Sequence, residues 1–109
     1  MADTPRFPYE GLREQVRAAL LKAGLDDAVA TVEAEIMVEA DLLGVPSHGV
    51  RMLPGLLAAI QSGSLNPRPQ LTFVRDSGPV CHLDGDRGPG RFVSRRSIEL
   101  AIERATQFG

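Results

Sequence analysis

The stretch "ADLLGVPSHGVRM", residues 40–52, decides how the helices of this 109-residue chain are divided. Gly44 can end a helix, because glycine readily adopts the left-handed conformation that follows a last helical turn. Ser47 can begin another helix as its N-cap, where a serine hydroxyl accepts a hydrogen bond from a free backbone N–H. The stretch therefore predicts two helices joined by a short connection.

Pro54 restricts the helix that follows Ser47. A proline inside a helix removes one backbone hydrogen bond and crowds the preceding turn. The helix therefore either kinks near Val50 or becomes regular only near Leu53. Both alternatives place Ser47 at or just before a helix N-terminus. The inward positions predicted by the spacing of apolar residues are Val50, Leu53, Leu57 and Ile60.

Two helices precede this stretch. The first extends from Tyr9 to Ala23 with one apolar stripe, and Gly24 stops it. The second begins after Asp26, whose side chain can accept a hydrogen bond from the first turn. The short connector predicts an antiparallel pair. The apolar stripe predicted for the second helix consists of Val29, Val32, Ile36, Ala40 and Leu43.

Shorter elements follow the third helix. "SGSLNPRPQ" is typical of a loop, and "LTFVR" and "VCHL" predict an antiparallel hairpin around "DSGP". A last helix is expected to begin near Arg91 or Phe92 and to end at Gly109. Its predicted inward positions are Val93, Ile98, Ala101, Ile102, Ala105 and Phe108.

This order predicts an α/β chain. Residues 1–64 form an N-terminal helical segment, and residues 65–109 form the start of an α/β main domain. Two strands and a helix bury little apolar surface by themselves, so the pattern is typical of the front part of a larger domain.

Composition excludes several classes of protein. The net charge of −2 argues against a nucleic-acid-binding module, and the apolar runs are too short to cross a membrane. "MADTPRFPYE" does not resemble a secretory signal, so we expect a cytoplasmic protein. Cys81 is the single cysteine and is expected to be a small buried hydrophobe. The acidic residues of the second helix, Glu33, Glu35 and Glu39 with Asp41 beyond, predict a solvated face rather than a metal site.

"SHGVR" is the first candidate for chemistry. His48 is the side chain type most easily used as an acid or base near neutral pH. Arg51 shares a face with it if the stretch is helical, and a guanidinium can bind a carboxylate with two parallel hydrogen bonds. From the residues alone, the alternatives stay open: Ser47 as a plain N-cap, His48 as a structural histidine and Arg51 as a surface charge.

"DGDRGPGR" is the second candidate, since a glycine-rich turn at a helix N-terminus can bind an anion. Its glycines do not follow the order of a dinucleotide-binding fingerprint, so a tight structural turn is favoured. His82 has no partner at a metal-ligand spacing and is expected to be a packed or edge residue.

The stretch "ADLLGVPSHGVRMLPGLLAAIQSGSLNPRPQ", with "LDGDRGPG" and the final "AIERA", resembles the malate/L-lactate dehydrogenase family of non-Rossmann oxidoreductases. That family includes ureidoglycolate and sulfolactate dehydrogenases, diketogulonate reductase and cyclic imino-acid reductases. The resemblance covers the chain from its first helix onward. Because family enzymes are about three times longer, it implies an N-terminal portion whose cofactor pocket lies largely in later sequence.

The resemblance implies interconversion of a small 2-hydroxy acid and its 2-oxo acid with NAD or NADP. It implies that His48 is the proton donor and acceptor, and that Ser47 and Arg51 bind the substrate's carboxylate. Many members carry the arginine one position later, where Met52 stands here. The family also implies a homodimer at full length. The rival hypothesis is a truncated, inactive chain that folds or self-associates without binding cofactor.

Overall fold

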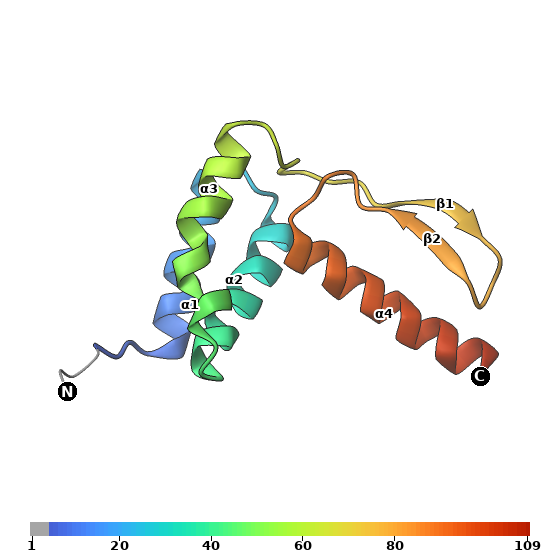
Figure 1. Ribbon diagram of the computed structural model, residues 1–109, viewed down its shortest axis with the longest axis horizontal. Helices are drawn as coiled ribbons and strands as arrows, with labels where there is room; N and C mark the ends of the chain where they lie inside the picture. The colour runs from blue at the N-terminus through green and yellow to red at the C-terminus, as the bar shows by residue number, and fades with distance from the viewer. Residues whose placement is uncertain (1–4) are drawn as a thin grey trace.

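The computed structural model describes residues 5–109, and these form an elongated molecule of 54 × 33 × 20 Å. A bundle of three helices lies at one end, and the fourth helix and a β-hairpin extend from it as an arm (Figure 1). The bounds of the helices and strands in the described chain are α1 Tyr9–Lys22, α2 Asp27–Leu42, η1 Pro46–His48, η2 Val50–Met52, α3 Leu53–Gln61, β1 Thr72–Asp76, β2 Cys81–Asp84 and α4 Gly90–Phe108, where η marks a single 3-10 turn. This mixed α/β order confirms the predicted fold class.

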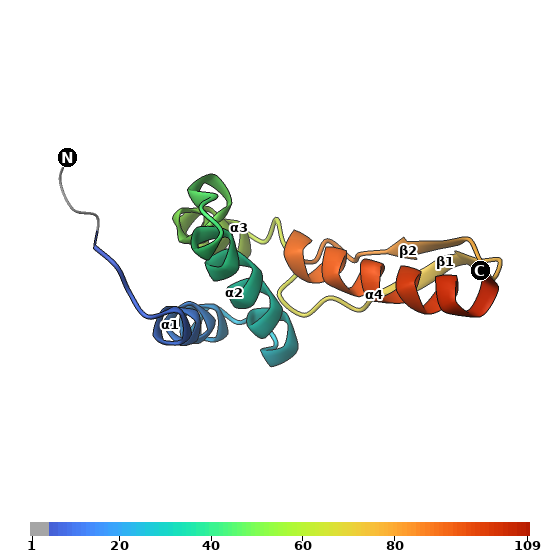
Figure 2. The same cartoon turned by 90° about the horizontal axis from the view of Figure 1, so that it is seen from below.

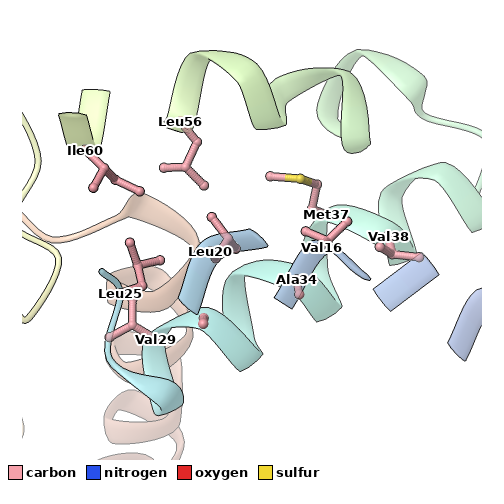
Figure 3. Close-up of a cluster of buried hydrophobic side chains, with 10 residues drawn as sticks. Val16, Leu20, Leu25, Val29, Ala34, Met37, Val38, Leu56 and Ile60 are labelled. Carbon is pink, nitrogen blue, oxygen red and sulfur yellow. The ribbon is translucent and has the colours of Figure 1, made fainter. Parts of the chain in front are cut away.

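The bundle is built on the antiparallel pair α1 and α2. Gly24 joins them at φ +107°, a left-handed conformation that glycine adopts without strain. Figure 3 shows the buried side chains that α1, α2 and α3 contribute to one core. The fully or almost fully buried apolar residues of this core are Val16, Leu20, Leu25, Val29, Ala30, Ala34, Met37, Val38, Leu56 and Ile60.

The predicted stripe of α2 is confirmed only in part, because Val29 is buried but Val32, Ile36 and Ala40 are only half-buried. Leu43 is 70% exposed, whereas Ala34 and Met37 are completely buried. The reason is that α2 packs against α1 and also against the start of α4, so its buried face is wider than one stripe and is turned toward both neighbours. Periodicity alone could not identify the second neighbour.

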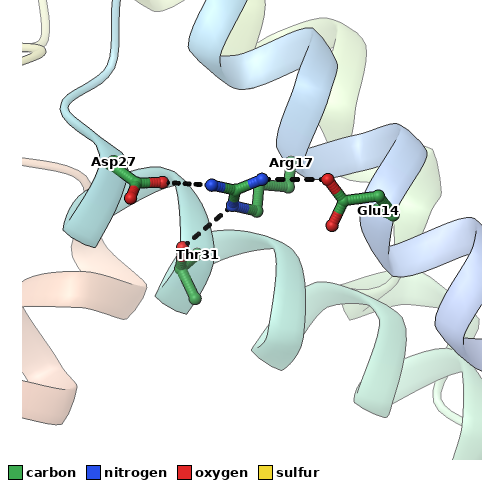
Figure 4. Close-up of polar contacts among 4 residues, drawn as sticks. All are labelled: Glu14, Arg17, Asp27 and Thr31. Carbon is green, nitrogen blue, oxygen red and sulfur yellow. Dashed lines mark hydrogen bonds and ion pairs between the residues drawn. The ribbon is translucent and has the colours of Figure 1, made fainter.

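The start of α2 also differs from the prediction. Among the described residues, α2 has no side-chain N-cap, and the Asp26 carboxylate instead lies 3.9 Å from Arg68. Arg17 of α1 joins the two helices, because its guanidinium contacts Asp27 and Thr31 of α2 as well as Glu14 of its own helix (Figure 4). The hydrogen bond to Asp27 raises the pKa of Arg17.

Glu33 corrects the prediction of a solvated acidic face. Glu39 is exposed, but Glu33 has no exposed surface at all. Its Oε2 accepts a hydrogen bond of 2.7 Å from the backbone N–H of Phe92, and its Oε1 lies 3.4 Å from Arg91. Burial raises the pKa of this carboxyl, while the two contacts act in the opposite direction. Glu33 therefore attaches the first turn of α4 to the bundle.

The predicted hairpin is confirmed. β1 and β2 are antiparallel, with Phe73 opposite Leu83 and an irregularity in register between Phe73 and Arg75. Arg104 of α4 holds the turn end of the hairpin, because its two terminal nitrogens lie 2.7 and 2.9 Å from the Asp76 carboxylate oxygens. The hydrogen bonds from Arg104 lower the pKa of Asp76 to about 2. In both ribbon views α4 runs beside the hairpin (Figures 1 and 2).

The predicted inward face of α4 is largely exposed. Ile98 is 55% and Ile102 60% exposed, and Phe108 is 48% exposed. The start of α4 packs on α2, and Phe92 reaches the core of the bundle, but the later turns have only the hairpin beside them within residues 5–109. Cys81 is half-buried rather than buried, and His82 is exposed on β2.

Candidate functional site

The segment between α2 and α3 folds into two 3-10 turns, η1 and η2. Gly49 separates them in an extended conformation at φ −91° and ψ −153°. Regular helix begins only at Leu53, which is the second of the two alternatives raised by Pro54. Ser47 is therefore not the N-cap of α3: it lies inside η1, six residues before Leu53, and makes no side-chain cap within the described chain.

Ser47 and His48 form a pair in η1. The Ser47 hydroxyl lies 3.0 Å from His48 Nδ1, and both residues are exposed. A hydrogen bond at Nδ1 fixes the orientation of the imidazole and leaves Nε2 as the ring nitrogen that can meet a ligand. An exposed imidazole oriented in this way is chemically able to exchange a proton at Nε2.

Arg51 lies in the next turn, η2, and is also exposed. Arg51 was expected to share a face with His48 only if the stretch were helical, and this condition is not met, because the extended Gly49 separates the two turns. Throughout residues 5–109, no hydrogen bond or ion pair engages the Arg51 guanidinium. Its fork of N–H donors is available for an anionic ligand.

Asp41 is a part of this site that residue-by-residue reasoning missed. Its Oδ2 accepts a hydrogen bond of 2.8 Å from the backbone N–H of Val50. A Cβ atom at Gly49 would collide with the same carboxylate, so any other residue there would displace Asp41 or the turn. The signal was present in the sequence, since Ala40-Asp41 belongs to the quoted motif that carries the family resemblance.

The glycine-rich turn "DGDRGPG" is structural. Asp86 and Arg87 adopt left-handed conformations at φ +54° and +55°. The Asp86 carboxylate accepts hydrogen bonds from the Asn66 side chain at 2.8 Å and from the Gln70 backbone at 2.9 Å. A Cβ at Gly88 would approach Pro69 to 2.8 Å, so the turn is closed against the loop before β1.

The turn before α4 does not fit the pyrophosphate of a nicotinamide dinucleotide. The glycine-rich turn leads into α4, which is where a pyrophosphate would be expected to bind free backbone N–H groups. That position is already taken, because the Glu33 carboxylate accepts the N–H of Phe92 and lies beside Arg91. A second anion there would meet a buried negative charge. In the described part of the chain, His, Cys, Asp and Glu residues also form no group of three that could hold a metal ion.

None of the helices in residues 5–109 is both long and apolar enough to cross a membrane.

A family model described as malate/L-lactate dehydrogenase matches residues 7–109. Malate dehydrogenase of Pyrococcus horikoshii is 36% identical to this chain, covering 95% of it and 29% of that protein. L-Sulfolactate dehydrogenase of Methanocaldococcus jannaschii is 34% identical, covering 92% of this chain and 29% of that protein. The L-lactate dehydrogenase of Cupriavidus necator is 35% identical over 89% of this chain and 28% of its own length.

Solved structures of similar proteins have the same fold as this chain. The malate dehydrogenase of P. horikoshii superimposes with a TM-score of 0.93, covering 96% of this chain and 30% of that chain. The sulfolactate dehydrogenase of M. jannaschii superimposes with a TM-score of 0.89, covering 93% of this chain and 29% of that chain. The chain thus spans about three tenths of the length of the relatives it matches, and it corresponds to the front part of a larger dehydrogenase structure.

Proposed function

The chain belongs to the malate/L-lactate dehydrogenase family, and from this premise we propose that it supplies the proton-transferring and carboxylate-binding part of an NAD(P)-dependent oxidoreductase. The reaction is the interconversion of a small 2-hydroxy acid and its 2-oxo acid. The observation that carries the proposal is the exposed Ser47–His48 pair, with its 3.0 Å contact, one turn before an exposed arginine.

In the oxidation direction, His48 accepts the proton of the substrate's hydroxyl group at Nε2, and in the reduction direction it returns that proton to the carbonyl oxygen. The Ser47 hydroxyl orients the imidazole through Nδ1. Arg51 binds the substrate's carboxylate, and Ser47 can add a hydrogen bond to it. The hydride itself is exchanged with a nicotinamide, either NAD or NADP, which we place outside the residues described above.

His48→Ala tests the proton transfer. In a protein that carries this segment at the full length of its relatives, we expect kcat to fall by about 10²–10⁴-fold with malate, L-lactate or L-sulfolactate as substrate. His82→Ala is the matched control, because it removes the chain's other histidine from an exposed position on β2. Turnover within twofold of wild type for His48→Ala, in a folded protein, would remove His48 from the mechanism.

Arg51→Lys tests the carboxylate clamp. Lysine keeps the positive charge but loses the planar pair of donors, so KM for the acid is expected to rise by about tenfold or more while kcat changes less. Arg68→Lys is the control, since Arg68 is an exposed arginine of the loop before β1. An unchanged KM for Arg51→Lys would show that the carboxylate is held elsewhere.

The surroundings of the site support a homodimer of the full-length protein. Leu42 is 68% exposed, and Leu43, Val45 and Met52 are also exposed beside the two 3-10 turns. An apolar surface of this kind next to a polar site is typical of a protein interface. Light scattering of the full-length protein tests this: Leu43→Lys should lower the mass toward that of a monomer, and an unchanged mass would contradict the proposed interface.

The exposed face of α4 favours a second candidate, in which the 109-residue chain by itself is inactive, holds no cofactor and self-associates. Ile98, Ile102 and Phe108 present apolar surface that nothing in residues 5–109 covers completely. The association state of the isolated chain and its response to NADH or NADPH distinguish this candidate from an active enzyme.

A further inference from the structure

We propose that Asp41 is the positioning residue that fixes His48 and Arg51 relative to each other. The inference rests on the proposed function, and it adds to it a residue that touches neither substrate nor cofactor. Two independent contacts carry the inference: the hydrogen bond from Val50 to Asp41 and the close approach of Asp41 to Gly49.

The hydrogen bond holds the point where the two 3-10 turns meet. Val50 N–H lies 2.8 Å from Asp41 Oδ2, and Val50 is the first residue of η2. His48 is two residues before this point and Arg51 is one residue after it. A shift of the Val50 backbone would therefore move both side chains.

The Asp41 carboxylate also fits closely against Gly49. Gly49 is buried, and a Cβ atom there would overlap the Asp41 carboxylate. The carboxylate thus occupies the volume that any other side chain at position 49 would fill. At the other end of the connection, Val45 N–H donates to the Ala40 carbonyl at 2.8 Å. Residues 46–48 are held between these two anchors on α2.

The position of Asp41 on α2 also points to this role. Asp41 lies in the last helical turn, where free carbonyl groups make negative charge unfavourable, and this turn contains no basic residue. Helix stability alone would favour lysine or arginine there. A residue that opposes local preference while completing a tertiary contact is typical of a functional site.

The test compares Asp41→Ala, Asp41→Asn and Glu39→Ala in the full-length protein. Asp41→Ala removes the acceptor, and a misplacement of about 1 Å can cost about 10²-fold in turnover, so we expect a fall in kcat of that order. Asp41→Asn keeps an acceptor oxygen for Val50 N–H and is expected to recover most of this loss. Glu39→Ala removes an exposed negative charge from the same end of α2 and should leave kcat within twofold of wild type.

A second pair of variants tests the geometry directly. Gly49→Ala collides with Asp41, and Asp41→Ala removes the group with which it collides. Gly49→Ala should therefore lower kcat much more in the wild-type background than in the Asp41→Ala background. Additive effects of the two substitutions would overturn the inference. So would kcat values for Asp41→Ala within twofold of wild type, or Asp41→Asn variants as slow as Asp41→Ala.

Hydrogen exchange of the Val50 amide gives a readout that does not depend on activity. In the 109-residue chain this amide should exchange slowly in wild type and Asp41→Asn, and at least tenfold faster in Asp41→Ala. If the Val50 amide exchanges at the same rate in all three proteins, Asp41 does not hold the Val50 backbone and the inference is overturned, whatever the kinetic measurements show. If His48→Ala has no effect on turnover, the proposed function fails, while the exchange rates still decide whether Asp41 holds the turn.

Discussion

Glu33 in the middle of α2 accepts a hydrogen bond of 2.7 Å from the backbone N–H of Phe92, 59 residues later, in the first turn of α4. The first N–H groups of a helix have no partner within the helix, and Glu33 satisfies one of them from another element. The carboxylate is completely buried and also lies 3.4 Å from Arg91. Glu33 is therefore a buried charged link between the bundle and the arm.

Glu33→Ala should lower the free energy of unfolding by about 3 kcal/mol, because it leaves the Phe92 N–H and the neighbouring guanidinium without their buried acceptor. Urea unfolding of the 109-residue chain, followed by circular dichroism, measures this change. Glu39→Ala is the control and should stay within about 0.5 kcal/mol of wild type, since Glu39 is exposed. Equal stability of the two variants would contradict the role given to Glu33.

The Asp76–Arg104 pair predicts a pH dependence at the far end of the arm. The hydrogen bonds from Arg104 lower the pKa of Asp76 from 3.8 to about 2 in the folded state. The folded state therefore binds fewer protons than the unfolded state between these values, so the stability contributed by this pair is fully present above pH 3.8 and is lost as the pH falls toward 2.

Arg104→Met tests this pair. The titration midpoint of the Asp76 carboxyl, followed by NMR, should move from about 2 toward its ordinary value of 3.8. Arg96→Met removes an arginine that contacts Glu99 on the surface of the same helix, and it should leave the Asp76 midpoint in place. If the titration midpoint of Asp76 stays near 2 in Arg104→Met, the backbone N–H of Gly78 is sufficient to hold the carboxylate in its charged form.

We predict that the 109-residue chain does not bind NADH or NADPH. The N-terminus of α4 is occupied by Glu33, and the glycine-rich turn before it is closed against Pro69. Because the chain contains no tryptophan, the fluorescence of added NADH or NADPH reports binding without interference. A saturable increase in fluorescence would show that these residues do form a cofactor site and would contradict the assignment of the turn as structural.

The exposed face of α4 predicts that the isolated chain self-associates. Ile102 is 60% exposed on this face, and Ile102→Lys places a charge at its centre. In sedimentation velocity, we expect wild type to shift to larger species as its concentration rises, and Ile102→Lys to remain smaller. Gln107→Lys adds the same charge to a different side of α4 and should behave like wild type. A wild-type chain that is monomeric at every concentration would contradict the second candidate function.

Residues that are close together in the sequence were sufficient to predict most of the helices and strands. Gly24 and Gly44 ended α1 and α2 as predicted, and the β-rich runs on either side of residues 77–80 paired as a hairpin. Pro54 restricted the third helix to two alternatives, one of which the structure contains. These features depend on residues close together in the sequence, so a sequence pattern is sufficient to predict them.

The sequence predicted which residues form the candidate site but not their local conformation. The quoted motif identified Ser47, His48 and Arg51 as candidates, with Ser47 as a helix cap and the other two on one face if the stretch were helical. The extended conformation of Gly49 prevents both, and the Asp41 carboxylate of α2 lies where a Cβ atom at position 49 would be. Whether these residues act as proposed stays a prediction.

Sequence patterns were sufficient to predict the approximate positions of the helices and strands, although not the two 3-10 turns, and to identify the motif that contains Ser47 and His48. Three features depend on how the elements pack in space: which face of α2 is buried, the role of Glu33 as a buried link rather than a solvated acid, and the contact of Asp41 with the turn beside His48. The apolar pattern of a helix indicates how much of the helix surface must be buried. It does not indicate which neighbouring elements cover that surface. A carboxylate's role depends on the N–H groups that those neighbours bring to it.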